Sequence, residues 1–151
     1  MLRVLIAILC LGGPTLADEL RYANSRFGTS ASLPMDVAPL QAPENGDGYH
    51  FSRSGLEGTI SIYGSHNIWG GGLAGYRKEL SKSFETITYK AGKKDWFVLS
   101  GHEGESIFYV RVRGCANGPM HHIHFQFPRE EKSKWDAVIA TYAKTLDGPC
   151  E

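Results

Sequence analysis

The feature that most limits the fold of this chain is a run of four strand-like segments in its second half. Each segment is short and rich in β-branched and aromatic residues, and turns rich in glycine and charged residues separate them. Connections this short join antiparallel neighbours, because parallel strands need a long crossover. The predicted strands cover residues 86–90, 96–101, 106–113 and 120–127.

An amphipathic helix is predicted after these strands, from about residue 130 to residue 146. Its apolar residues recur at spacings of three and four, and Gly148-Pro149 follows as a helix stop. Strands in a run, closed by a helix with one apolar stripe, predict an α+β domain with a mainly antiparallel β-sheet packed against that helix. The apolar stripe consists of Trp135, Val138, Ile139, Tyr142 and Leu146.

The first half of the chain predicts two hairpins and a second, shorter helix. Residues 20–33 form the first hairpin, and the second joins residues 49–52 to residues 58–63. The proline-containing stretch over residues 35–43 predicts irregular structure. Apolar residues at helical spacing place the shorter helix over residues 73–84.

The N-terminus has the three-part layout of a secretory signal peptide. Arg3 supplies the positive charge, residues 4–11 are apolar, and Thr15-Leu16-Ala17 supplies small residues for cleavage. The apolar run is far shorter than the roughly 20 residues that span a bilayer, so no stable membrane anchor is expected. The sequence therefore predicts a signal peptide over residues 1–17 and a single domain over residues 18–151, periplasmic or secreted.

Export determines how the cysteines are interpreted. Cys10 falls in the predicted signal peptide, which leaves Cys115 and Cys150 in an oxidising compartment. Two cysteines allow one intramolecular pairing, so we expect a disulfide that ties the C-terminal tail to the turn around Cys115. The alternative, two free thiols, requires a reducing compartment.

The residues best suited to metal chemistry are two histidines on the last predicted strand. Side chains alternate along a strand, so His122 and His124 share a face about 7 Å apart and both can reach one metal ion. Zinc needs three or four ligands, and no spacing identifies the others among His50, His102, Glu103 and Glu105. The alternative, which the sequence favours, makes His122 and His124 partly exposed sheet residues opposite an inward face of Ile123, Phe125 and Phe127.

No residue stands in a recognisable catalytic pattern. Ser100 and His102 can share a strand face, but such pairs are common at strand ends, and no serine occupies a nucleophile elbow. Gly70-Gly71-Gly72 lacks the Lys-Ser/Thr of a phosphate-binding loop, which favours a mobile loop. We therefore expect no enzymatic activity and no cofactor.

Three short motifs in the first half carry a family resemblance. They are Tyr22-Ala23-Asn24-Ser25-Arg26-Phe27-Gly28, Leu33-Pro34 and Glu44-Asn45-Gly46-Asp47-Gly48. In this respect the chain resembles small exported bacterial proteins of unassigned role and, more distantly, the PsbP-like family of extrinsic photosystem proteins and their bacterial relatives. The resemblance implies an α+β sandwich and an accessory or binding role without an active site. It transfers no ligand residue.

Two aromatic residues in predicted loop regions are the candidates for binding. Trp69 lies beside the three glycines and Tyr49 beside the acidic turn, where exposed aromatic side chains serve as anchors for partners, unless each folds back onto the core. The chain has 16 basic and 16 acidic residues, which does not match the basic surface of a nucleic-acid-binding protein.

The sequence therefore favours a non-enzymatic exported binding or accessory protein, whose partner is another protein or a small ligand in the periplasm. Two alternatives stay open. One is a metal-binding protein that uses His122 and His124. The other is an inhibitor or immunity protein for a periplasmic enzyme.

Overall fold

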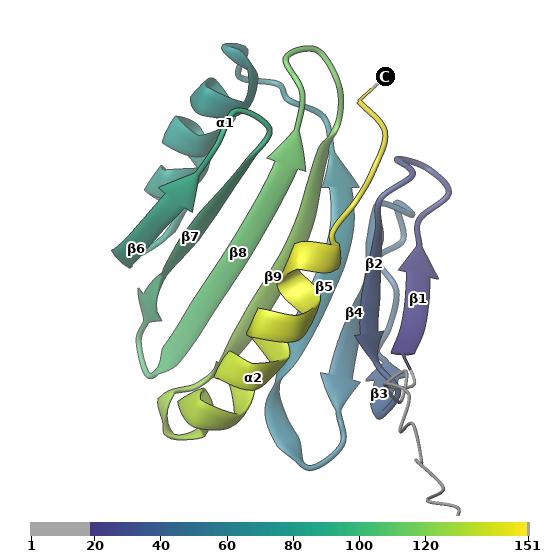
Figure 1. The fold of residues 1–151 in the computed structure, drawn as a ribbon, viewed down its shortest axis with the longest axis vertical. Coiled ribbons are helices and arrows are strands. Elements are labelled where there is room, and N and C mark those ends of the chain that lie inside the picture. Colours follow the sequence, from purple (N-terminus) through teal and green to yellow (C-terminus); the bar gives the residue numbers. More distant parts are fainter. Residues whose placement is uncertain (1–18, 151) are drawn as a thin grey trace, which may run out of the picture.

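The computed structural model describes residues 19–150, which form two antiparallel sheets and two main helices (Figure 1). The larger sheet has seven strands in the order β3-β4-β5-β9-β8-β7-β6, and the smaller sheet pairs β1 with β2. Strands β6 to β9 form a meander, and β9 then pairs with β5, which joins the two halves of the chain at the centre of the sheet. The predicted signal peptide lies outside the described residues.

The bounds of the elements are as follows. The strands are β1 Glu19–Ala23, β2 Ser30–Pro34, β3 Val37–Pro39, β4 Gly48–Arg53, β5 Leu56–Ser65, β6 Thr86–Gly92, β7 Trp96–Glu103, β8 Ser106–Gly114 and β9 Met120–Pro128. The helices are α1 Gly72–Leu80 and α2 Lys132–Tyr142, with 3-10 turns at Ser81–Ser83, Arg129–Glu131 and Ala143–Thr145.

One face of the large sheet is covered by α2 and by the β1–β2 hairpin. In Figure 1, α2 crosses in front of β9 and β5, and the hairpin lies beside it near β4. The indole of Trp135 stacks on Phe127 with ring centroids 5.3 Å apart, and its Nε1 donates a hydrogen bond to the Glu57 carbonyl. This larger core consists of Ala31, Leu33, Phe51, Ile60, Ile62, Ile107, Ile123, Phe125, Phe127, Trp135, Val138, Ala143 and Leu146.

The opposite face carries a second, smaller core under α1. Leu73 and Tyr76 of the helix pack on β7 and β8, and Phe84, just after the helix, stacks on Phe108 with ring centroids 4.0 Å apart. The sheet side chains of this core are Phe97, Leu99, Phe108, Val110, Val112 and Met120. Each helix thus covers only part of its face, and α1 and α2 lie on opposite sides of the sheet.

The predicted α+β class, both hairpins, both helices and all four strands of the second half are confirmed. The expectation of an irregular stretch over residues 35–43 is wrong for Val37–Pro39, which pair with β4 as the edge strand β3. A proline is compatible with this position because an edge strand has one side without a ladder partner. The C-terminal helix is also shorter than predicted, since α2 ends at Tyr142 and a 3-10 turn continues to Thr145.

The predicted disulfide between Cys115 and Cys150 is present, with Cα atoms 5.4 Å apart. The tail before it is held along its length. Ser30 and Asp147 exchange two backbone hydrogen bonds of 2.8 Å, and His121 Nε2 lies 2.7 Å from the Pro149 carbonyl. A carbonyl only accepts, so Nε2 carries the proton, and Nδ1 of the neutral ring accepts from the Thr29 hydroxyl at 2.7 Å.

Within residues 19–150, neither helix has the length and apolar character needed to cross a membrane.

Candidate functional site

Five segments distant in the sequence meet at one end of the large sheet, which we call the loop end. Met120, the first residue of β9, pairs with both Ser65 at the end of β5 and Gly114 at the end of β8, so these strand ends coincide. The loop end lies at the top of Figure 1. It comprises residues 24–29, 40–47, 66–72, 115–119 and 147–150.

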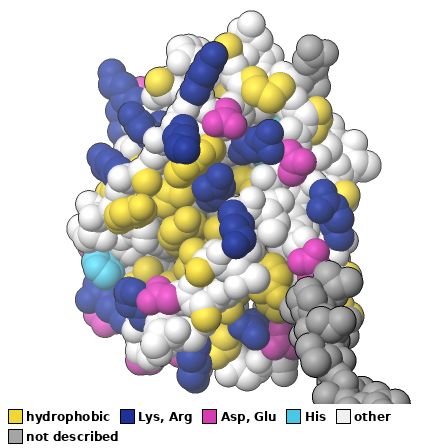
Figure 2. Space-filling view, in the orientation of Figure 1, with side chains coloured by type: hydrophobic (Ala, Val, Ile, Leu, Met, Phe, Trp, Pro, Cys, Tyr) yellow, Lys and Arg dark blue, Asp and Glu magenta, His cyan; other side chains and the backbone are white. Residues whose placement is uncertain are grey.

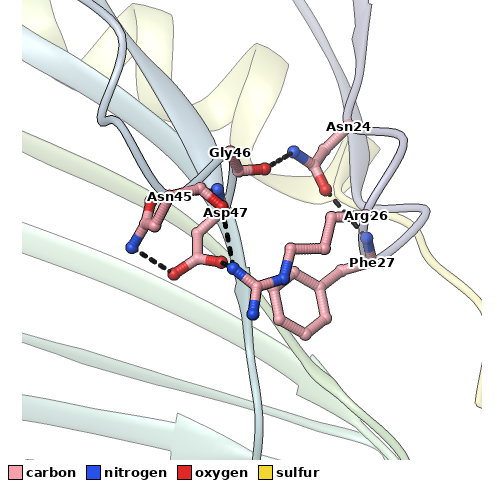
Figure 3. A network of polar contacts seen from close by, with 6 residues as sticks. All are labelled: Asn24, Arg26, Phe27, Asn45, Gly46 and Asp47. Atoms are coloured by element: carbon pink, nitrogen blue, oxygen red, sulfur yellow. Dashed lines mark hydrogen bonds and ion pairs between the residues drawn. The ribbon is translucent and has the colours of Figure 1, made fainter.

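A polar network joins the first two of these segments (Figure 3). Asn24 accepts a hydrogen bond from the Phe27 amide at 2.8 Å and donates one to the Gly46 carbonyl at 2.7 Å. Arg26 reaches the Asn45 carbonyl at 2.7 Å and the Asp47 carboxylate at 2.5 Å. Two of the three motifs that carry the family resemblance therefore meet in one network, in which the β1–β2 turn is tied to the loop before β4.

Phe27 connects this network to the end of β5 and to His66 through packing contacts. Its side chain fills the space above Gly64, where an added Cβ would lie 2.2 Å from the Cβ of Phe27. The Arg26 guanidinium lies 5.2 Å from the Phe27 ring centroid on one side, and the His66 ring meets it edge-on at 5.0 Å. Phe27 is buried, whereas His66 is exposed.

The glycine-rich segment after β5 has a defined conformation. Gly70, Gly71 and Gly72 all have positive φ, between 59° and 72°, a region that other residues rarely adopt. Asn67 closes the loop, because its side chain donates to the Gly72 carbonyl at 3.0 Å and accepts from the Trp69 amide at 3.2 Å. The glycines thus place residues 68 and 69 at the tip of a hydrogen-bonded turn that leads into α1.

Two hollows adjoin this turn. One, of about 690 Å³, lies between the glycine-rich loop and the disulfide-linked turn of residues 116–119. The other, of about 630 Å³, lies between the Arg26-Phe27 turn and Pro149. His66 and Pro119 line both, so the two hollows are neighbours, and we call them together the loop-end groove.

The exposed apolar side chains beside the groove are Ile68 and Trp69. Ile68 is 79% exposed and Trp69 is 48% exposed. The inner part of the Trp69 ring packs on Tyr76, with centroids 5.0 Å apart, which holds the indole in place while much of it faces solvent. Trp69 therefore has the combination of rigidity and exposure that suits a binding anchor.

The other predicted binding residue, Tyr49, lies elsewhere. It is on the face of β4 that packs under the β1–β2 hairpin, with its ring 6.2 Å from Tyr22 and 5.5 Å from Phe51. Tyr49 is thus half-buried at the edge of the larger core, whereas Trp69 packs on the smaller core. The structure does not bring the two predicted residues together.

His122 is fully buried, so the expectation that it is partly exposed is wrong. Its Nε2 lies 3.0 Å from Ser65 Oγ and 3.1 Å from Tyr76 Oη, and its ring stacks on Tyr63 with centroids 4.3 Å apart. Burial, with a smaller contribution from neighbouring histidines, lowers the pKa of His122 to about 3. The ring is therefore neutral. Its contacts with Ser65 and Tyr76 link the end of β5 to α1, and Trp69 packs on the same Tyr76.

His124 lies on the same face, two residues along, and is partly exposed as expected. Its ring meets Phe84 and Phe108 edge-on at 6.1 and 6.4 Å. Burial, and to a lesser extent the charge of His50, lowers the pKa of His124 to about 4. Its Nε2 is buried without a hydrogen-bond partner in the described chain.

The metal hypothesis stays a prediction. In the part of the chain that the structure describes, no three His, Cys, Asp or Glu side chains are grouped closely enough to hold a metal ion. Because Ser65 and Tyr76 already contact His122 Nε2, an ion shared with His124 needs the buried Nδ1 of His122. The described geometry thus favours a role for His122 in packing and hydrogen bonding.

Solved structures of other proteins share this architecture. The fold is similar to the solution structure of cyanobacterial PsbP (CyanoP) from Synechocystis sp. PCC 6803, with a TM-score of 0.63 and 13% identity, covering 91% of this chain and 96% of that one. A crystal structure from Bacteroides thetaiotaomicron VPI-5482 matches with a TM-score of 0.49 and 18% identity, covering 82% of this chain and 46% of that one. No protein-family model and no curated protein matches the chain. The distant PsbP-like resemblance is confirmed at the level of the fold.

Proposed function

We propose that this chain is an exported, non-enzymatic accessory protein that binds a protein partner through the loop end. A PsbP-like fold is consistent with an accessory role. The observation that carries the proposal is that the exposed Ile68 and Trp69 lie together on a hydrogen-bonded turn beside the two neighbouring hollows. Large apolar side chains held rigidly next to a concavity are typical of the anchor residues of protein interfaces.

The frame around this groove supports the proposal. The disulfide holds the turn of residues 115–119 on one side of the groove, and the ion pair of Arg26 with Asp47 holds the β1–β2 turn on the other. His122 contacts Ser65 at the end of β5, from which the glycine-rich loop starts. A preorganised surface loses little conformational entropy on binding. The inhibitor or immunity role is one form of this function, in which the partner is a periplasmic enzyme.

Export is part of the proposal, and one mass measurement tests it. We expect the intact mass of the secreted, unreduced protein to match a chain that begins at Asp18 and lacks two hydrogen atoms, because Cys115 and Cys150 are joined. Thiol titration of the same sample after unfolding should find no free thiol. A mass that retains residues 1–17, or two titratable thiols, would contradict the exported form.

Binding through the loop end is tested by replacing its exposed apolar residues. Ile68→Ser with Trp69→Ser should reduce cross-linking of a protein partner in host cells by at least about tenfold, since anchor residues of an interface contribute more than about 1.4 kcal/mol. The matched control is Met35→Ser, which removes a 58% exposed apolar side chain outside the loop end.

The control should leave partner capture unchanged, and both variants should remain folded at the temperature of the assay. Equal capture by the wild type and the loop-end variant would place the partner surface elsewhere. If the captured partner is an enzyme whose activity falls on binding, the protein is an inhibitor.

A further inference from the structure

Arg111 occupies an unusual position on the face of the sheet that α2 covers only in part. In Figure 1, α2 lies over β9 and β5, and no helix is drawn in front of β6 and β7. Figure 2 shows hydrophobic side chains gathered on this face, with Lys and Arg side chains around them. By register, Arg111 of β8 lies between Val98 and Ile123, both almost completely buried. The positively charged side chain of Arg111 therefore begins among apolar residues of the sheet.

The guanidinium of Arg111 has an aromatic neighbour, but within residues 19–150 no carboxylate lies within ion-pair distance of it. Its Cζ lies 4.1 Å above the Trp96 ring, the distance of a cation–π contact. Its Nε is buried without a hydrogen-bond partner, and within residues 19–150 no carboxylate forms an ion pair with it. Burial lowers the pKa of Arg111, and Tyr109 and Asp95 only partly oppose this effect. A half-buried cation without an ion-pair partner keeps part of its desolvation cost, so a ligand that supplies a carboxylate gains affinity there.

Two tyrosines complete the surroundings. Tyr109, two residues before Arg111 on the same face, is half-buried at the edge of the larger core. Tyr89 of β6 is 55% exposed and lies close enough for its charge to affect the pKa of Tyr109, which burial raises. Trp, Tyr and Arg, which share this partly exposed surface, are the residue types enriched at the centres of protein interfaces.

Arg113 provides a comparison within the same strand. It points to the same face, two residues further on, but its guanidinium is paired with Asp147. Among the described residues, Arg113 thus has an ion-pair partner and Arg111 has none. Because Arg presents parallel N–H donors that match a carboxylate, the free group is suited to a single Asp or Glu side chain.

We propose that the Trp96, Tyr109 and Arg111 surface is a docking site for an acidic segment of a protein partner, with an Asp or Glu carboxylate on Arg111. The charge complementarity with Arg111 and the aromatic side chains beside it favour a peptide carboxylate. None of these residues lines the loop-end groove, so the site is a second contact area, independent of Trp69.

The test is an NMR titration of the mature protein with a hexaglutamate peptide at about physiological ionic strength. We expect the Trp96 indole and Arg111 Nε–H signals to shift on addition of the peptide. Arg111→Lys keeps the charge but loses the two parallel donors, and should weaken binding by about tenfold. Arg113→Lys is the matched control on the same strand and should leave the affinity unchanged.

Three results would overturn the proposal. One is no shift of the Trp96 and Arg111 signals at millimolar peptide. Another is equal weakening by both lysine variants, which would show a general attraction between charges. The third is tighter binding of trigalacturonate or inorganic phosphate than of hexaglutamate, which would make the site a receptor for an acidic sugar or a phosphate.

Discussion

Phe125→Ala should lower the free energy of unfolding by about 3 to 5 kcal/mol, because it leaves a cavity in the larger core. Phe125 is fully buried at the centre of β9, and its ring meets Tyr109 and Trp135 edge-on at 6.1 and 6.3 Å. Both sides of this cavity belong to ordered elements, the sheet and α2, so little collapse is expected. Urea unfolding measures the loss as a lower midpoint with an unchanged slope.

The matched control is Gln126→Ala, on the next residue and the opposite face of the same strand. Gln126 is half-exposed, and its side chain donates one long hydrogen bond, of 3.3 Å, to Glu103. Its loss should cost under about 1 kcal/mol. If Phe125→Ala does not fold, Phe125→Leu leaves a smaller cavity and preserves the comparison. Similar small losses for Phe125→Ala and Gln126→Ala would contradict the orientation of β9.

The architecture was predictable because its signals are local. Alternation along residues 120–127, turns between the meander strands and the spacing of Trp135 and Val138 each depend on nearby residues. The edge strand β3 was not predictable in this way, since only three residues pair and one of them is Pro39. These residues form a strand because they pair with β4, and the sequence of residues 37–39 alone does not reveal that pairing.

The burial of His122 shows where an alternating pattern misleads. A polar residue opposite Ile123 suggests a solvent-facing side, but β9 is the central strand of the sheet and α1 covers part of that side. Whether a strand is central depends on the pairing of β9 with β5, which are separated by more than 50 residues of chain in this sequence. The hydrogen-bond partners of His122, Ser65 and Tyr76, come from those distant segments.

The loop end was only partly predictable for the same reason. The Trp69 loop was marked by its glycines, and the disulfide by the two remaining cysteines. The network of Asn24, Arg26 and Asp47 was missed, although both motifs were recognised, because nothing in either sequence motif pairs it with the other. A basic residue in one polar turn and an acidic residue in another were the available signal.

Acidification should destabilise this protein well before its carboxylates titrate. His122 and His124 are neutral when folded, with pKa values of about 3 and about 4, whereas an unfolded histidine takes up a proton below about pH 6.5. The unfolded state therefore binds more protons between those values. The stability that comes from keeping these two histidines neutral is fully present above about pH 6.5. It is lost as the pH falls toward about 4, by about 1.4 kcal/mol of unfolding free energy per pH unit for each histidine.

At about pH 5 the two histidines together should therefore cost about 4 kcal/mol relative to neutral pH, a large part of the stability of a small domain. Urea unfolding at several pH values measures this slope. His124→Gln removes one of the titrating histidines, so it should make the slope shallower even if it also shifts the stability at neutral pH. Burial also lowers the pKa of His121, which adds to the slope that remains. A wild-type stability that stays constant between about pH 6.5 and about pH 5 would mean that these two rings accept protons in the native state, and the buried, neutral arrangement of His122 beneath α1 would then be incorrect.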